Sequence, residues 1–234
     1  MSVIIDFHTH ILPEMDDGSK SIEMSEQMLE LSKTQGIGAI AATPHFYASQ
    51  MTLKDFLKRR DAAYGNIYKR AAGLGIHLLF GAETAFFAGI GSASGIEDLA
   101  ISGTSLFLLE MPFREWTGSD IQEVEKLLER GLTPVLAHIE RFFPYQKDKK
   151  IFDELYALPV LSQVNAEALA SWKTRRLALK LFENNRAHLL GSDCHNISTR
   201  PPNLAAGREI IEKKLGSPYL VQIDRLGSRL SGLS

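Results

Sequence analysis

Residues 3–10 read VIIDFHTH, and this stretch carries both the first expected strand and the first reactive side chains of the chain. Val3–Phe7 is apolar at every position except Asp6, a pattern typical of a strand buried on both faces of a parallel sheet. His8 and His10 follow at once. Two histidines at positions i and i+2 of an extended strand end point the same way and can share one metal ion. The stretch therefore predicts a parallel sheet with polar chemistry at the carboxyl ends of its strands.

Six further apolar runs resemble the first one, and helical patterns separate them. The runs are Gly38–Thr43, His77–Gly81, Ser105–Glu110, Thr133–His138, Val160–Asn165 and Ala187–Gly191. Helices are expected from Met24 to Gly36, from Leu53 to Gly73 behind a capping box at Thr52–Asp55, from Ile121 to Gly131, and over Ser171–Asn184 and Asn203–Leu215. The tail GSRLSGLS, residues 227–234, is expected to be a frayed end.

Seven βα-like units within 234 residues predict one α/β domain that spans residues 1–234. The pattern fits a (β/α) barrel or, alternatively, a doubly wound sheet. A net charge of −2 gives no sign of a nucleic-acid or membrane partner held by bulk charge. No apolar window reaches the length of a membrane span, so no membrane insertion is expected. The single cysteine excludes an internal disulfide and fits a reducing, cytoplasmic location. The oligomeric state stays open.

Polar side chains cluster where the expected strands end. His8 and His10 follow the first strand, and six more such residues follow later ones: His45, Glu83, Glu110, His138, Asp193 and His195. Asp16 and Asp17 lie in the loop after the first strand. In a barrel the carboxyl ends of the strands converge on one mouth, so these groups are expected to meet. Imidazole nitrogen and carboxylate oxygen suit Zn²⁺, Mn²⁺ or Fe²⁺, and the number of ligands predicts two or three ions. His77 and His188 lie at strand starts and are expected to be structural.

Several longer motifs resemble the polymerase-and-histidinol-phosphatase (PHP) family, and within it the bacterial tyrosine phosphatases associated with capsule and exopolysaccharide synthesis. The motifs are IDFHTHILPEMDDGSKS (5–21), ATPHF (42–46), GAE (81–83), LLEMP (108–112), LTPVLAHIER (132–141) and GSDCHNISTRPPN (191–203). They run in the family's order over most of the chain. The resemblance implies a distorted (β/α)7 TIM-like barrel, the PHP fold, with a trinuclear metal centre.

Carried over by motif position, the resemblance implies a role for each polar residue. A first ion would be held by His8, His10, Glu83 and Asp193, a second by Glu83, Glu110 and His138, and a third by Asp17, His45 and His195. Asp16 would brace the loop instead. Arg141 and Arg200 match the phosphate-binding arginines of this branch. The implied activity is manganese-dependent hydrolysis of phosphotyrosine on a bacterial tyrosine kinase that regulates polysaccharide synthesis, with Fe or Zn as other metals.

Aromatic residues follow the same motifs and allow two interpretations. Phe46, Tyr47, Phe113 and Trp116 can line a slot for a phosphotyrosyl ring, with Phe46 and Trp116 as substrate contacts. They can equally pack the rim of the barrel.

Three other functions compete with this hypothesis. Cys194 and Arg200 have the spacing of a cysteine phosphatase, but the residues between them include no glycine to let backbone N–H groups curl around a phosphate. Another PHP hydrolase acting on a small phosphomonoester such as histidinol phosphate would use the same ligands. A metal-binding module without catalysis is the third, and the complete set of ligands argues against it.

Overall fold

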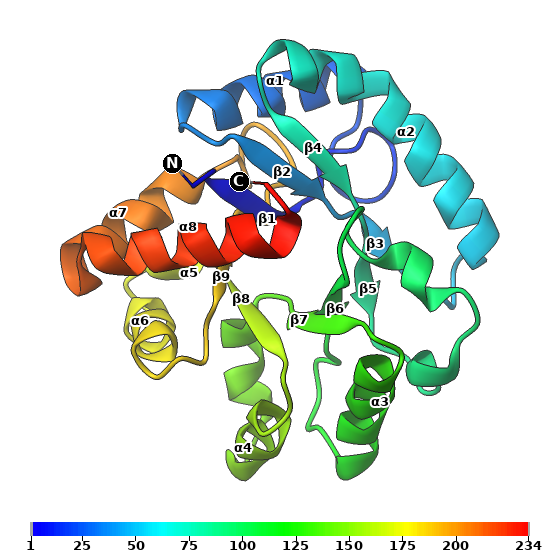
Figure 1. The fold of residues 1–234 in the computed structure, drawn as a ribbon, viewed down its shortest axis with the longest axis vertical. Helices are drawn as coiled ribbons and strands as arrows, with labels where there is room; N and C mark the ends of the chain where they lie inside the picture. Colours follow the sequence, from blue (N-terminus) through cyan, green and yellow to red (C-terminus); the bar gives the residue numbers. More distant parts are fainter. Residues whose placement is uncertain (1, 234) are drawn as a thin grey trace.

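The computed structural model describes residues 2–233 as parallel strands that curl into a distorted barrel with helices around it (Figure 1). The strands are β1 (Ile5–Thr9), β2 (Ala39–Ala42), β3 (His45–Phe46), β4 (His77–Phe80), β5 (Glu83–Ala85), β6 (Leu106–Glu110), β7 (Thr133–Leu136), β8 (Leu161–Asn165) and β9 (Leu189–Gly191). They form a sheet β1-β2-β4 and a sheet β3-β5-β6-β7-β8-β9, and each strand pair of residues 2–233 is parallel. The expected barrel is confirmed.

The barrel closes where its first and last strands meet. Thr9 forms a parallel bridge with Cys194. The Asp193 N–H donates to the His8 carbonyl at 2.8 Å, and the His10 N–H donates to the Cys194 carbonyl at 2.9 Å. These contacts exclude the doubly wound alternative, in which the two edges stay apart. They also bring the HTH and SDCH motifs side by side.

Two of the expected strands, 38–43 and 77–81, are each followed by a short strand that the periodicity did not predict. Thr43 and Pro44 separate β2 from β3, and Gly81 and Ala82 separate β4 from β5. Proline has no N–H to donate to a ladder. The Pro44 carbonyl still accepts from the Glu83 N–H at 3.0 Å, so the ladder continues past the break. As a result β3 pairs with β5 with His45 directly opposite Glu83.

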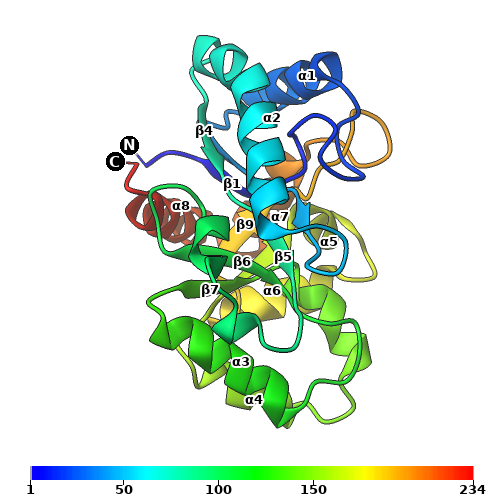
Figure 2. The same cartoon turned by 90° about the vertical axis from the view of Figure 1, so that its right-hand side faces the viewer.

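The helices surround the barrel (Figure 2). They are α1 (Ile22–Thr34), α2 (Leu53–Gly73), α3 (Gly118–Glu129), α4 (Lys150–Tyr156), α5 (Ala166–Ala170), α6 (Arg175–Glu183), α7 (Leu204–Leu215) and α8 (Ser217–Ser231). The Thr52 hydroxyl accepts from the Asp55 N–H at 3.2 Å, which confirms the expected helix start there. The helix predicted over Ser171–Asn184 begins only at Arg175. Side chains of Thr174 and Arg175 donate to carbonyls at the end of α5, which separates the two helices.

The expectation of a frayed tail is wrong for residues 227–231, which belong to α8. Leu226 and Leu230 of α8 pack on a small core cluster that alternate residues of β1, β2, β6 and β7 form, together with Leu189. Gly227 lets this helix approach closely, because a Cβ there would lie 2.9 Å from the Phe7 ring. Within residues 2–233, no helix combines the length and the apolar character that crossing a membrane requires.

Candidate metal centre

All nine side chains predicted as metal ligands come together at the carboxyl ends of the strands. Three groups of potential ligand atoms each lie within 4.8 Å of one another: His10, Asp17, His45 and His195; His8, His10 and Asp193; and His45, Glu83 and Glu110. His138 adjoins the third group, because its Nε2 lies 2.8 Å from Glu83 Oε1 and 3.4 Å from Glu110 Oε1. The structure thus places both His45 and His138 beside the two glutamates, where the sequence motifs implied His138 alone.

Glu83 is the centre of this cluster and is fully buried. Its Oε2 lies 3.1 Å from His8 Nε2, 3.2 Å from His10 Nε2 and 3.0 Å from His45 Nδ1. Its Oε1 faces His138 instead. Burial acts to raise the pKa of Glu83, but the charge of His8 and the close ring nitrogens of its other histidine neighbours hold the pKa well below its usual range. Glu83 therefore presents an anion whose two oxygens face different sets of nitrogen atoms, as a bridging ligand would.

Asp193 and His138 hold unusual backbone conformations. Their φ angles are 52° and 31°, in the left-handed region that non-glycine residues rarely adopt. Such residues cost about 1–3 kcal/mol each and gather at functional sites. Burial acts to raise the pKa of Asp193, but the charges of His8 and Arg141 and a hydrogen bond from His10 hold it below its usual range. Asp193 is thus an anion held in a strained position.

Histidine orientation follows from the fixed acceptors behind each ring. His195 Nδ1 lies 2.9 Å from the Asp193 carbonyl, which can only accept, so this nitrogen carries the proton. His195 Nε2 then offers a lone pair 3.3 Å from Asp17 Oδ1. Asp16 Oδ2 lies 2.7 Å from His10 Nδ1 and also accepts from the His45 N–H at 2.8 Å. Asp16 therefore braces His10 and the loop, the role that the sequence motifs implied.

The donor set fits divalent ions. Buried atoms that lack a hydrogen-bond partner within residues 2–233 include Glu83 Oε2, His45 Nδ1 and His195 Nε2. Leaving a buried polar atom unsatisfied costs about 1–3 kcal/mol, so three of them at one mouth need an explanation. All three belong to residues that the motifs place around the ions. Imidazole nitrogen with carboxylate oxygen is a ligand set that Mn²⁺, Fe²⁺ and Zn²⁺ accept.

Both predicted phosphate-binding arginines reach the same atom. Arg141 Nη2 and Arg200 Nη2 each lie 2.8 Å from Asp193 Oδ2. Their side chains are 36% and 34% exposed, so each guanidinium can still be reached by a ligand from solvent. Arg141 lies in a short 3₁₀ helix (Ile139–Tyr145) after β7 and Arg200 in the loop after β9, so the two side chains converge on the mouth of the barrel from different elements.

The aromatic residues divide into buried and accessible ones. Trp116 is 4% exposed, packs against Phe142 and Phe152, and donates from Nε1 to the Pro112 carbonyl at 3.0 Å. The structure thus places Trp116 in the barrel wall and not in an open slot. Phe113 is 45% exposed and stacks on His138 with ring centroids 6.1 Å apart.

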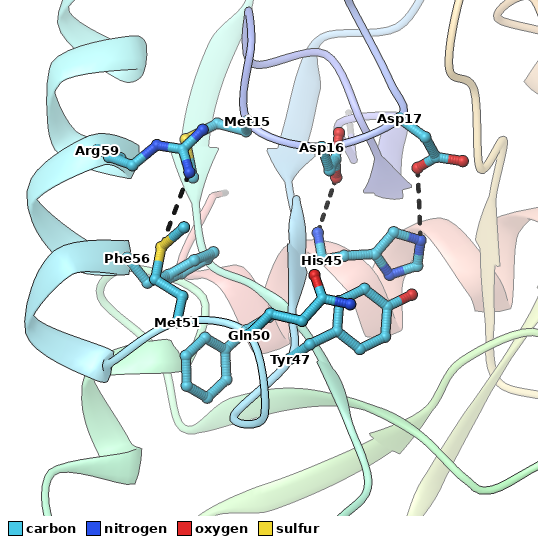
Figure 3. Close-up of a pocket in the computed structure, with 10 residues that line it drawn as sticks. Met15, Asp16, Asp17, His45, Tyr47, Gln50, Met51, Phe56 and Arg59 are labelled. Atoms are coloured by element: carbon cyan, nitrogen blue, oxygen red, sulfur yellow. Dashed lines mark hydrogen bonds and ion pairs between the residues drawn. The ribbon is translucent and has the colours of Figure 1, made fainter.

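A pocket of about 440 Å³ adjoins the ligands Asp17 and His45. Figure 3 shows Tyr47 and Gln50 beside His45, with Met51 and Arg59 on the opposite side of the pocket. Phe46 also lines it, although that side chain is only 3% exposed. The pocket therefore combines apolar and aromatic side chains with charged and polar ones, next to the predicted metal ligands.

Cys194 does not take part in this site. Its side chain is fully buried, and burial raises the pKa of the thiol to about 12. A cysteine nucleophile needs an accessible thiolate at neutral pH. The cysteine-phosphatase alternative is therefore excluded by the geometry.

Two residues near the ligands have no counterpart in the sequence predictions. Gln163 and Asn165, at the end of β8, contact His8 and Asp193 respectively. The only available signal was a pair of amides at i and i+2 on a strand end that carried no ionisable side chain.

The sequence family described as "Capsular polysaccharide synthesis, CpsB/CapC" matches residues 4–227. The tyrosine-protein phosphatase YwqE of Bacillus subtilis is 30% identical over 224 residues, which cover 93% of this chain and 88% of YwqE. The tyrosine-protein phosphatase CpsB of Streptococcus agalactiae is 28% identical over 231 residues, 94% of each chain.

Solved structures of other proteins also resemble this chain. The crystal structures of YwqE from Bacillus subtilis and CpsB from Streptococcus pneumoniae, described as metal-dependent tyrosine phosphatases, include a chain that matches with a TM-score of 0.85 and 26% identity, covering 99% of this chain and 95% of that one. The phosphotriesterase homology protein of Escherichia coli matches with a TM-score of 0.61 and 10% identity, covering 98% and 99%, and shares the fold alone.

Proposed function

The chain belongs to the CpsB/CapC family of capsular polysaccharide synthesis, and on this basis we propose that it is a metal-dependent tyrosine-protein phosphatase, a phosphoric monoester hydrolase. The observation that supports the proposal most strongly is that two features lie at the same end of the barrel. Three overlapping groups of metal-type ligands lie at one mouth, and two arginines converge on Asp193 at the same mouth.

The resident ions are proposed to be two or three Mn²⁺, with Fe or Zn as alternatives. His8, His10, Glu83 and Asp193 would hold the first, Glu83, Glu110 and His138 the second, and Asp17, His45 and His195 the third. When bound, such ions polarise a phosphoryl oxygen and lower the pKa of water to about 7. Glu83 and Asp193 supply the negative charge that keeps these cations in place.

Arg141 and Arg200 bind and orient the phosphate. A guanidinium donates two parallel hydrogen bonds to a phosphate and keeps its charge at any relevant pH. Because Arg141 lies in a 3₁₀ helix and Arg200 in a loop but both contact Asp193 Oδ2, they can bind a phosphate placed at that edge from two sides. Phosphoryl transfer depends mainly on such positioning and charge neutralisation.

The accessible aromatics suit a phosphotyrosyl ring. Phe113 stacks on His138 and Tyr47 lies beside His45, with ring centroids 5.1 Å apart. We assign the ring of the substrate to the space next to these residues, and the neighbouring peptide to the pocket that Phe46 and Met51 line. The leaving phenol has a pKa of about 10, which is lower than that of an alkyl alcohol, so its departure needs little help from an acid. The substrate protein is proposed to be a phosphotyrosine-bearing bacterial tyrosine kinase, as capsule synthesis suggests.

The test compares a phosphotyrosine peptide with histidinol phosphate on metal-analysed protein. We expect the purified chain to contain about two to three divalent ions, because a two-metal hydrolytic site requires at least two. Chelation should abolish hydrolysis of the peptide, and Mn²⁺ should restore it. A chelated protein that is free of metal but still active would refute the proposal. A higher kcat/KM for histidinol phosphate than for the peptide would move the substrate to small phosphomonoesters.

A further inference from the structure

β8 is the strand whose carboxyl end carries amides where its neighbours carry ionisable ligands. Gln163 is fully buried and Asn165 is 2% exposed. Side chains at i and i+2 of a strand lie on the same face, so both amides reach toward the mouth. Burying two amides is costly unless their hydrogen bonds are satisfied. The hydrogen-bond partners of Gln163 and Asn165 therefore indicate which groups the two amides position.

The direction of these hydrogen bonds follows from one backbone group. The His138 N–H donates to the side-chain oxygen of Gln163, Oε1, at 2.9 Å. A backbone N–H can only donate, so this assignment of oxygen and nitrogen in the Gln163 amide is fixed by geometry. His8 Nδ1 lies 3.0 Å from the same Oε1. That nitrogen must therefore carry the proton of the His8 ring.

The tautomer of His8 is thus set for binding a cation. With the proton on Nδ1, the lone pair of neutral His8 is on Nε2. Nε2 lies 3.1 Å from Glu83 Oε2 and 3.6 Å from Asp193 Oδ1, and both carboxylates belong to the ligands proposed for the first ion. An outer acceptor that fixes the tautomer of a metal-binding histidine is a common arrangement, and its loss lowers metal affinity.

The second amide continues the chain of hydrogen bonds. Gln163 Nε2 donates to Asn165 Oδ1 at 2.8 Å. The nitrogen of Asn165 then donates to Asp193 Oδ2 at 2.8 Å. This bond occupies one carboxylate oxygen and turns the other, Oδ1, toward His8 and His10, whose Nε2 atoms lie 3.6 and 3.4 Å away.

The Gln163 side chain fits beside His8 because position 191 is a glycine. A Cβ on Gly191 would lie 2.8 Å from Gln163 Nε2 and 2.6 Å from the His8 Cβ. The GSD motif therefore combines a ligand, Asp193, with the glycine that lets Gln163 approach His8.

We propose that Gln163 and Asn165 are positioning residues of the metal centre: Gln163 fixes the Nδ1–H tautomer of His8, and Asn165 orients Asp193 toward the same ion. Neither amide binds the ion itself. The inference rests on the proposed metal-dependent function, and it names the contacts through which β8, a strand without a ligand, supports that centre.

The test uses metal-free protein first, because the Nδ1 proton of His8 can be observed without any ion. In ¹⁵N-histidine NMR spectra of the wild type, this proton should exchange slowly with solvent, because Gln163 Oε1 accepts it, whether or not Nε2 is also protonated beside Glu83 and Asp193. Gln163→Leu should lose the slow exchange, whereas Gln163→Glu should keep it, because a carboxylate still accepts from both His8 and His138. Asn165→Leu should leave the Nδ1 proton of His8 unchanged.

Mn²⁺ affinity, measured by calorimetry, is the second readout. Gln163→Leu and Asn165→Leu should each weaken binding by about 10- to 100-fold, the usual cost of losing an outer contact. Gln146→Leu is the matched control. Gln146 is 2% exposed, and its side chain bonds to the backbone of Trp116 and Arg114, so its loss should destabilise the fold but leave Mn²⁺ affinity unchanged.

Each outcome is decisive. Equal Mn²⁺ affinity in wild type, Gln163→Leu and Asn165→Leu would overturn the inference, and so would equal losses in these variants and Gln146→Leu. If Gln163→Leu does not fold, Gln163→Glu decides: loss of the slowly exchanging Nδ1 proton of His8 in this variant would refute the role of Gln163. A wild type that binds no Mn²⁺, Fe²⁺ or Zn²⁺ would instead refute the proposed function.

Discussion

Replacing either arginine at the mouth by alanine should lower phosphotyrosine hydrolysis without removing metal. Arg141 and Arg200 each contact Asp193 Oδ2, but neither side chain is among the predicted ligands. When one arginine is removed, the other and Asn165 still hold Asp193. The orientation of the carboxylate, and with it metal content, should therefore persist in Arg141→Ala and in Arg200→Ala.

The magnitude follows from the contact that is lost. A hydrogen bond to a charged group contributes about 1.5–3 kcal/mol, and 1.36 kcal/mol corresponds to a tenfold change in rate. Both side chains are about one-third exposed, so solvent weakens the contact and the lower half of that range applies. We expect kcat/KM for a phosphotyrosine peptide to fall by about 10- to 50-fold in each single variant. The double variant should lose less than the product of the two, because both arginines serve one phosphate.

The assay pairs steady-state kinetics with metal analysis of the same samples. Arg208→Ala is the control, because Arg208 makes a two-point ion pair with Asp224 between α7 and α8 and contacts none of the predicted ligands. It should keep both activity and metal. If metal content falls in parallel with activity in Arg141→Ala and Arg200→Ala, the arginines are structural supports and the assignment to phosphate is refuted.

Three further predictions concern the centre itself. Chelated protein titrated with Mn²⁺ to 100 times its Kd should gain about 2.7 kcal/mol of stability, or about 5–10 °C in Tm by thermal shift, and an unchanged Tm would contradict a metal site in the folded state. Glu83→Gln keeps the shape but removes the charge that faces four histidines, so metal analysis should show at least one ion lost and activity should drop by more than about 100-fold. The Cys194 thiol is fully buried, so it should stay unlabelled by Ellman's reagent in the folded protein and react on denaturation. Because such a thiol is neither accessible nor ionised, Cys194→Ser should retain activity within about twofold. Rapid labelling of active protein would show that the mouth of the barrel is more open than described.

The architecture could be predicted from the sequence because parallel strands leave a strong local signal. The seven expected strands lie where continuous apolar runs lie, since a strand covered on both faces has to be apolar throughout. The ligands were predictable for a related reason. A histidine or acid directly after such a run, as in DFHTH or SDCH, has to stand at the carboxyl end of a strand, and a barrel brings those ends together.

The unpredicted parts depend on partners that are distant in sequence. The strand pair β3 and β5 is too short for any periodicity, and its register, with His45 opposite Glu83, joins residues that are 38 positions apart. The α8 tail reads as small and polar, GSRLSGLS, yet Gly227 is what allows it to pack on Phe7. The role of Gln163 depends on the N–H of His138, 25 positions earlier. No local pattern contains these relations.

Asp193 lies where the proposed metal centre and the proposed phosphate site meet. Three nitrogen atoms, from Asn165, Arg141 and Arg200, lie 2.8 Å from its Oδ2. A carboxylate oxygen offers about two lone-pair sites, so one of these donors is in excess. The Asn165 amide is buried and fixed by Gln163, whereas both guanidinium groups are about one-third exposed. An arriving phosphate can therefore take an arginine from Asp193 without leaving the carboxylate unsatisfied. Under the proposed function, Asp193 would keep the arginines at the mouth until the phosphate of the substrate replaces it as their partner.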